Sequence, residues 1–187
     1  MKIKKIESEW PNEENFDKLD EGQAFFLFEQ AEKQLKETSD IGNIVVTRAT
    51  TLITLVSGLL IALIGYSFSR WQTIFHLDTL TETCLFVSAY LCIIIVLLAL
   101  NIIGKNYFII GSEPKSLFVD AFFNSPLSDS KRLIHFYVSE IVNYQRRIEK
   151  NKKKNKIRWK LFNISLFMVL AIPLIISITY AIVNHYG

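Results

Sequence analysis

Histidines are the side chains of this sequence best suited to acid–base chemistry near neutral pH. His76 follows Arg70 with five residues between them, whereas His185 stands alone near the C-terminus. His135 lies one helical turn after Arg132, and this pair could serve phosphodiester cleavage only if two copies combined their residues. No cluster of Asp, Glu or Cys has metal-ligand spacing. We therefore expect no metal, no cofactor and no catalytic site, and we interpret Arg132 and His135 as solvated helix surface.

A second group of residues could bind an anionic molecule. Ser112 stands in a Gly-Ser-Glu-Pro sequence that predicts the start of a helix. A helix N-terminus can hold phosphate, so this segment is either a plain N-cap or a nucleotide contact. The lysine run at 150–156 suits either anionic lipid or nucleic acid. The candidate contacts for a trigger molecule, which could be a protein, an RNA or a nucleotide, are Ser112, Arg146, Arg147, Lys152, Lys153 and Lys154.

Charged residues are absent from three long windows of the sequence. All 21 Lys and Arg and all 18 Asp and Glu lie outside residues 49–69, 83–104 and 161–187. Uncharged apolar runs of about 20 residues are typical of membrane-spanning helices. The two cysteines both fall in the second window and are interpreted as small apolar residues. The sequence therefore predicts an all-α integral membrane protein with three transmembrane helices, and excludes an ordinary soluble enzyme.

The distribution of basic residues predicts an orientation in the membrane. Residues 1–48 hold seven Lys and Arg, residues 70–82 hold one, residues 105–160 hold thirteen, and residues 161–187 hold none. Basic residues accumulate on the cytoplasmic side of a bilayer. We expect a protein of the inner (cytoplasmic) membrane with its N-terminus in the cytoplasm and its C-terminus outside.

These spans divide the chain into seven segments. A helical apolar stripe marks the first cytoplasmic segment, and its members are Ala24, Leu27, Phe28, Ala31 and Leu35. Gly42 is a candidate bend between this segment and the first span. The expected segments are a flexible arm at 1–15, an amphipathic cytoplasmic helix at 16–46, transmembrane helix 1 at 47–69, an outer loop at 70–82, transmembrane helix 2 at 83–104, a basic helical cytoplasmic segment at 105–160, and transmembrane helix 3 at 161–184.

A heptad pattern precedes the third span. Residues at alternating intervals of three and four form a predicted oligomer seam, namely Ile134, Tyr137, Ile141, Tyr144, Ile148, Asn151 and Asn155. The seam must pack on the 16–40 helix, on a helix at 114–124 or on neighbouring copies. Its asparagines either fix the register of a buried seam or lie in water where the seam splays apart. We expect one unbroken helix from about residue 129 into the third span, where Pro173 can bend it.

The first span carries small and hydroxyl residues along roughly one face. They are Thr50, Thr54, Ser57, Gly58, Ala62 and Gly65. Such a stripe permits close helix packing in lipid, and it could equally line a pore in an oligomer. No ionisable residue lies within any span, which argues against a proton-coupled transporter or a voltage sensor. Three spans are too few to enclose a transport path in one chain, so a pore would need several copies.

The layout resembles small prokaryotic membrane effectors of antiviral defence, on the evidence of residues 40–63, 111–114 and 144–170. It is similar to the transmembrane effectors of nucleotide-signalling systems (Pycsar and the SLATT group) and to the membrane accessory proteins of type VI-B CRISPR loci. The resemblance implies an oligomer that perturbs the membrane when infection is sensed. Type VI-B members are linked to a divergent HEPN ribonuclease motif, whose nominal match here, Arg70 to His76, falls in the predicted outer loop.

These expectations define three hypotheses about function. The first is an oligomeric pore or membrane-depolarising effector in antiviral defence, triggered through its cytoplasmic helices, with the bilayer and further copies as partners. The second is a membrane-anchored binding module that recruits a soluble partner. The third is a membrane-tethered HEPN-like ribonuclease.

Overall fold

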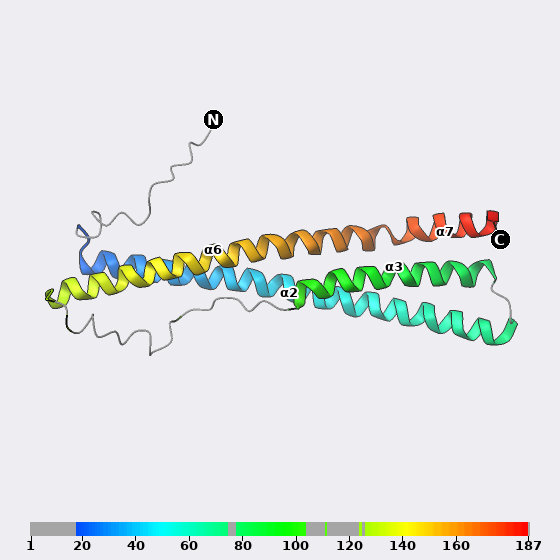
Figure 1. Cartoon of the computed structure of the whole chain (residues 1–187), viewed down its shortest axis with the longest axis horizontal. Helices are drawn as coiled ribbons and strands as arrows, with labels where there is room; N and C mark the ends of the chain where they lie inside the picture. The colour runs from blue at the N-terminus through cyan, green and yellow to red at the C-terminus, as the bar shows by residue number, and fades with distance from the viewer. Residues whose placement is uncertain (1–17, 75–77, 104–110, 112–123, 125, 187) are drawn as a thin grey trace, which may run out of the picture. The chain divides into compact units, whose positions relative to one another are not determined.

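The computed structural model describes residues 18–74, 78–103, 111, 124 and 126–186. Within these ranges the chain is all-helical and has no strand, as the sequence predicts. Figure 1 shows the helices α2 (Glu21–Ile74), α3 (Thr79–Ile102), α6 (Asp129–Leu170) and α7 (Ile172–Tyr186). The predicted flexible arm at 1–15 and the predicted helix at 114–124, apart from Asn124, lie outside the described residues.

Helix α2 is continuous where the sequence predicted two segments. It begins after a capping box, in which the Asp20 carboxylate accepts from the Gln23 amide at 2.7 Å and the Gln23 side chain accepts from the Asp20 amide at 3.2 Å. The helix then continues through Gly42, which is buried and does not interrupt it. The amphipathic segment and the first span are therefore one helix.

Helices α2 and α3 extend into the region that the sequence predicted as an outer loop at 70–82. Helix α2 continues to Ile74, and α3 begins at Thr79. Asp78 caps α3, because its carboxylate accepts from the Thr81 amide at 2.9 Å. Asp78 therefore marks the start of α3, although the charge pattern had placed this residue inside a predicted loop.

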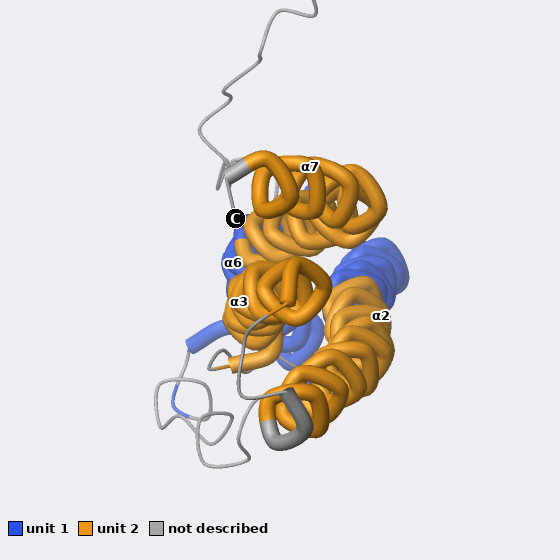
Figure 2. The backbone as a smooth tube through the Cα atoms, turned by 90° about the vertical axis from the view of Figure 1, so that its right-hand side faces the viewer, with its two compact units in different colours: residues 1–40, 107–153 blue, residues 41–106, 154–187 orange. Residues whose placement is uncertain are grey.

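The chain divides into two compact units, which Figure 2 colours separately. Unit 1 contains Met1–Asp40 and Tyr107–Lys153, so its described helices are the first part of α2 and the first part of α6. These two helices run parallel, since Phe25 of α2 contacts Tyr137 of α6 and Thr38 contacts Asn151. A parallel pair allows two heptad seams to meet in one register.

The core of unit 1 is aromatic at one end and aliphatic at the other. The Phe28 ring lies 5.4 Å from that of Tyr137 and is stacked 5.5 Å from that of Tyr144. Leu35 packs with Tyr144 and Ile148 in one buried cluster. On α2 the contacting positions follow the same three-and-four spacing as on α6: Ala24, Phe28, Ala31, Leu35 and Thr38. Leu27, which the sequence placed in this stripe, is 42% exposed instead.

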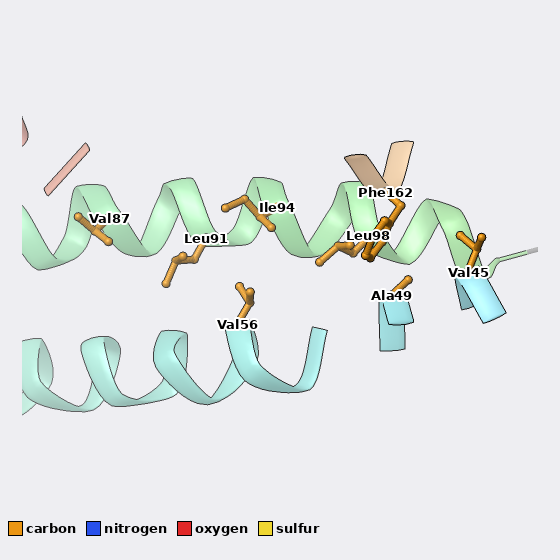
Figure 3. Close-up of a cluster of buried hydrophobic side chains, with 8 residues drawn as sticks. All are labelled: Val45, Ala49, Val56, Val87, Leu91, Ile94, Leu98 and Phe162. Atoms are coloured by element: carbon orange, nitrogen blue, oxygen red, sulfur yellow. The ribbon is translucent and has the colours of Figure 1, made fainter. Parts of the chain in front are cut away.

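Unit 2 contains Ile41–Asn106 and Lys154–Gly187 and holds the apolar spans. Its core joins α2, α3 and α6, as Figure 3 shows, through the buried side chains Val45, Ala49, Val56, Val87, Leu91, Ile94, Leu98 and Phe162. Helix α3 also packs along α7. Three-and-four spacing returns on α3 from Val87 to Leu98, which is the pattern of left-handed helix packing in water and in lipid alike.

Large apolar side chains also cover the outside of unit 2. Among those exposed are Leu55, Ile61, Phe68, Phe86, Ile93, Val96, Leu100, Phe167, Leu170 and Leu174. An apolar surface surrounding an apolar core is typical of helices in a bilayer. Two helices, Glu21–Trp71 and Thr79–Ile102, contain stretches long and apolar enough to cross a membrane, and the bent pair α6–α7 makes a third if it is one span.

Helix α6 runs unbroken from Asp129 into the third uncharged window, as the sequence predicts, and the chain is bent near Pro173, where the sequence allowed a bend. Helix α6 ends at Leu170, α7 begins at Ile172, and the two are bent by 49°. Pro173 causes the break, because it has no N–H to donate to the carbonyl four residues earlier and its ring clashes there. The Tyr90 hydroxyl of α3 donates to the Met168 carbonyl at 2.9 Å, at the end of α6 where carbonyls lose their helical partners.

Replacing Leu35 by Ala tests the core of unit 1. Leu35 has no exposed surface, so Leu35→Ala should lower the free energy of unfolding by about 3 kcal/mol. Leu27→Ala makes the same chemical change two turns earlier on an exposed side chain, and should cost less than about 1 kcal/mol. Denaturant titration followed by circular dichroism in detergent measures both. Equal losses for the two variants would contradict the assignment of the core face.

Alkaline pH should weaken unit 1 through Tyr144. Burial raises the pKa of the Tyr144 hydroxyl above its usual range. The neutral form is therefore favoured by folding, and its contribution is complete below about pH 10 and is lost as pH rises through the folded-state pKa. The difference in unfolding free energy between the wild type and Tyr144→Phe should be constant below about pH 10, and above it the wild type should lose stability relative to the variant. A difference that stays constant at high pH would contradict the burial of this hydroxyl.

Candidate functional site

The predicted seam on α6 is buried within the chain itself. Tyr144, Ile148, Asn151 and Asn155 are all buried, while Ile134, Tyr137 and Ile141 are half-buried. In unit 1, Tyr144 and Ile148 pack on Leu35 of α2. Of the partners left open by the sequence, the structure places the chain's own first helix against these two positions. A seam between copies at Ile134, Tyr137 and Ile141 remains a prediction.

The seam asparagines lie inside the fold rather than in water. Asn151 has no exposed surface, and its Nδ2 donates to the Thr38 hydroxyl at 3.4 Å. Thr38 in turn donates to the Leu35 carbonyl at 2.8 Å, so a polar chain crosses from α6 to α2 within unit 1. A buried amide that needs a specific partner favours one register over a slipped one. Asn155, in unit 2, is also buried.

A buried asparagine that the sequence analysis passed over ties α3 to α6 in unit 2. Asn101 has no exposed surface. In the amide orientation that satisfies both of its groups, it donates to the Arg158 carbonyl at 2.9 Å and accepts from the Phe162 amide at 3.3 Å. The signal was present in the sequence, because Asn101 follows Leu98 at the same interval as Ile94 follows Leu91.

The small-residue stripe of α2 lies on a face that no described helix covers. Thr50, Thr54, Gly58, Ala62 and Gly65 are exposed, and Ser57 is half-buried. A Cβ added at Gly58 or at Gly65 would meet no atom within 4 Å. Gly58 follows the buried Val56 by two residues, which places it about 200° around the helix. The stripe therefore faces away from the core of unit 2, and does not pack against another of the described helices.

Hydroxyl groups on this face are already bonded to their own helix. Thr50 donates to the Val46 carbonyl at 3.0 Å, and Thr54 donates to the Thr50 carbonyl at 3.1 Å. Thr51 beside them donates to the Thr47 carbonyl at 3.1 Å. Each hydroxyl proton is thereby satisfied without water, while the oxygen keeps a lone pair that can accept. Such a face is stable against lipid or another helix, and still offers acceptors to a cation or to water.

The candidate trigger contacts do not all lie free on the surface. Arg146, Lys152 and Lys153 are exposed, and Lys154 is half-buried. Arg147 donates to the Gly111 carbonyl at 2.7 Å and lies 5.8 Å from the centre of the Tyr144 ring. It holds the chain at Gly111, whose φ of +88° suits a glycine. Ser112 lies outside the described residues.

Of the Arg and His residues considered for catalysis, Arg132 and Arg70 contact side chains of their own helices. Arg132 forms an ion pair with Asp129 in the first turn of α6, and His135 is exposed. Arg70 donates to the Tyr66 hydroxyl at 3.3 Å and lies over the Tyr66 ring. His76 lies outside the described residues. Among the residues the structure describes, no three or more His, Cys, Asp or Glu gather to hold a metal.

Comparison with known proteins yields no similarity from which to carry over a role. No protein family, no curated protein and no solved structure matches the chain. A function must therefore be inferred from the exposed faces of α2 and α6 and from the contacts that fix them.

Asn101→Ala tests the tie between α3 and α6. Removing a hydrogen bond between membrane helices should lower the free energy of unfolding by about 1 kcal/mol. Ser88→Ala on the same helix is the control, because the Ser88 hydroxyl donates to the Cys84 carbonyl of its own helix at 2.7 Å. Thermal unfolding in detergent should show a lower midpoint for Asn101→Ala alone. Equal midpoints for the two variants would show that Asn101 makes no effective contact with α6.

Proposed function

We propose that the protein is a homo-oligomeric membrane effector whose copies meet through the exposed small-residue face of α2. The observation that carries this proposal is that Gly58 and Gly65 leave open space on a helix long and apolar enough to cross a membrane. Small residues let the backbones of two membrane helices approach closely. A second copy carries the same small-residue face, so identical chains can pack there side by side around a common axis.

The neighbouring helix supports this interpretation by contrast. On α3, where Ala89 and Cys92 are the small exceptions, most exposed positions carry bulky side chains, namely Leu85, Phe86, Ile93, Val96 and Leu100. These residues suit acyl chains, because nothing in lipid requires a small or hydroxyl side chain at the surface. The exposed face of α2 instead carries Thr50, Thr54 and Gly58 at one-turn intervals. Helix α2 thus has a stripe of small and hydroxyl residues beside exposed bulky ones such as Leu55 and Ile61, whereas the exposed surface of α3 has no such stripe.

Several copies around an axis would bring these hydroxyl-bearing faces together as the lining of a pore. The Thr50 and Thr54 hydroxyl groups donate hydrogen bonds to carbonyls of their own helix, so the remaining lone pairs of their oxygens would face the axis. Oxygen acceptors of this kind favour cations and water over anions. We therefore propose a path that depolarises the membrane, and that conducts without a charged residue inside the span.

The biological setting follows from the resemblance to antiviral membrane effectors. We propose that the trigger acts on unit 1, whose two helices carry exposed basic residues such as Arg146 and Lys152. In the proposed role the protein catalyses no reaction. Its effect on an infected cell would come from membrane depolarisation after a cytoplasmic protein, RNA or nucleotide has bound.

Substitution at Gly58 tests both assembly and conductance. A Cβ added at residue 58 meets no described atom within 4 Å, so the fold of the single copy should persist in Gly58→Leu while two α2 faces can no longer approach closely. Ala89→Leu adds a similar side chain on the exposed surface of α3 and serves as the control. We expect Gly58→Leu to reduce the particle mass in detergent to that of one chain, and to reduce cation flux from liposomes at least tenfold, whereas Ala89→Leu changes neither.

Two outcomes would contradict the proposal. The proposed pore is contradicted if the wild-type protein assembles but passes no ion in liposomes and does not depolarise the membrane of infected cells. If Gly58→Leu assembles and conducts like the wild type, the α2 face is contradicted as the interface.

A membrane-anchored binding module is the second candidate, and one observation favours it. Phe26 lies in unit 1 on the face of α2 turned away from Leu35 and is 57% exposed, and Leu27 beside it is exposed as well. Exposed aromatic side chains in a segment outside the apolar spans are typical of protein–protein contacts. Under this alternative a soluble partner binds unit 1, and liposomes containing the protein stay sealed.

A further inference from the structure

Four residues of unit 2 gather at the edge of the uncharged windows. Arg48 immediately precedes the first window on α2, and Lys160 immediately precedes the third on α6. Lys156 lies one turn before Lys160, and both are exposed. Trp159 lies between them in sequence and is half-buried. The cluster therefore stands where an apolar segment meets a polar one, which in a bilayer is the level of the lipid headgroups.

Arg48 and Trp159 are in direct contact across two helices of this unit. The guanidinium carbon of Arg48 lies 5.6 Å from the centre of the Trp159 ring. A guanidinium held by its face against an indole keeps its N–H donors at its edge. Those donors form the planar fork that binds two oxygens of a phosphate. The stack thus fixes the position of Arg48 without consuming its hydrogen bonds.

The sequence supplies no acidic partner for these cations nearby. Residues 41–77 and 150–187 contain no Asp or Glu at all. Basic residues concentrated at a membrane boundary without carboxylates attract anions from outside the chain. Among the described residues no carboxylate pairs with Arg48, Lys156 or Lys160, so an anion from the surroundings can serve as their counter-ion.

The exposed face of α6 changes from basic to apolar about one turn after Lys160. Lys156, Lys160, Ile164 and Phe167 recur at intervals of four, four and three, so they share one face of the helix. Ile164 and Phe167 are exposed as well. Two ammonium groups followed by two large apolar side chains match, in order, the headgroup and the acyl chain of a phospholipid. A nucleic acid would use the basic residues but would leave this apolar continuation unused.

We propose that Arg48, Lys156, Trp159 and Lys160 form a binding site for the headgroup phosphate of an anionic phospholipid. Arg48 and the two lysines bind the phosphate oxygens, Trp159 positions Arg48 and lies at the headgroup level, and Ile164 and Phe167 contact the acyl chain. The site requires only that the chain spans a bilayer, and it is independent of assembly through Gly58 and of conductance.

Quenching of Trp159 by labelled lipid tests the site in the full chain. Trp10→Phe and Trp71→Phe leave Trp159 as the only tryptophan, and the protein is placed in phosphatidylcholine vesicles with a small fraction of brominated phosphatidylglycerol. Brominated phosphatidylcholine at the same fraction is the reference lipid. We expect phosphatidylglycerol to quench Trp159 more strongly than phosphatidylcholine. Arg48→Gln, Lys156→Gln and Lys160→Gln together should lower this preference by about fivefold for each charge removed.

A second triple variant, which removes the same number of charges elsewhere, distinguishes a specific binding site from general electrostatic attraction to the membrane. Lys33→Gln, Lys36→Gln and Lys131→Gln remove three exposed cations of unit 1, and should leave the preference unchanged. Arg48→Lys keeps the charge but loses the planar fork, and should lower the preference in part. The proposal is overturned if both triple variants lose equally, if millimolar inorganic phosphate relieves the quenching, or if a short RNA does so.

Discussion

Alternating three- and four-residue intervals between buried positions are the constraint on which the rest of this structure depends. They recur on α2 from Ala24 to Thr38 in unit 1 and from Val45 to Val56 in unit 2. The same spacing runs along α6 from Tyr144 to Phe162. A helix keeps one face toward its neighbours over many turns only when contacts recur at this average interval. Because the buried face is fixed, the opposite face is fixed too, and each proposed function belongs to an outward face.

The forces that hold this spacing differ between the two units. In unit 1, burial of Leu35 and Tyr144 gains from removing apolar surface from water. In a bilayer that gain vanishes, since lipid is as apolar as leucine, and association depends on small residues and hydrogen bonds instead. Unit 2 has both, in Ala49 at its core and in the Asn101 contact with the backbone of α6. The open Gly58 offers the same kind of contact to a second copy.

Much of this arrangement could be predicted from residue patterns, and the parts that could not have physical reasons. Charge exclusion located the apolar spans, and the heptad rule found the buried positions Tyr144, Ile148, Asn151 and Asn155 on α6. The pattern could not name the partner, because a seam looks the same whether it meets its own chain or a copy. Asn101 was missed because a lone amide in an apolar run resembles an interruption of the span. Pro173 indicated a bend, but the angle of 49° depends on backbone geometry that a residue pattern does not specify.

Disulfide cross-linking in the membrane tests the central claim, that the exposed face of α2 is where copies meet. With Cys84 and Cys92 replaced by Ala, a single cysteine is placed at Gly58 or, as the comparison, at the exposed Ile93 of α3. Mild oxidation of dilute protein in native membranes should yield a covalent dimer for Gly58→Cys and none for Ile93→Cys. A dimer through Ile93→Cys alone, or none through either position, would contradict the account.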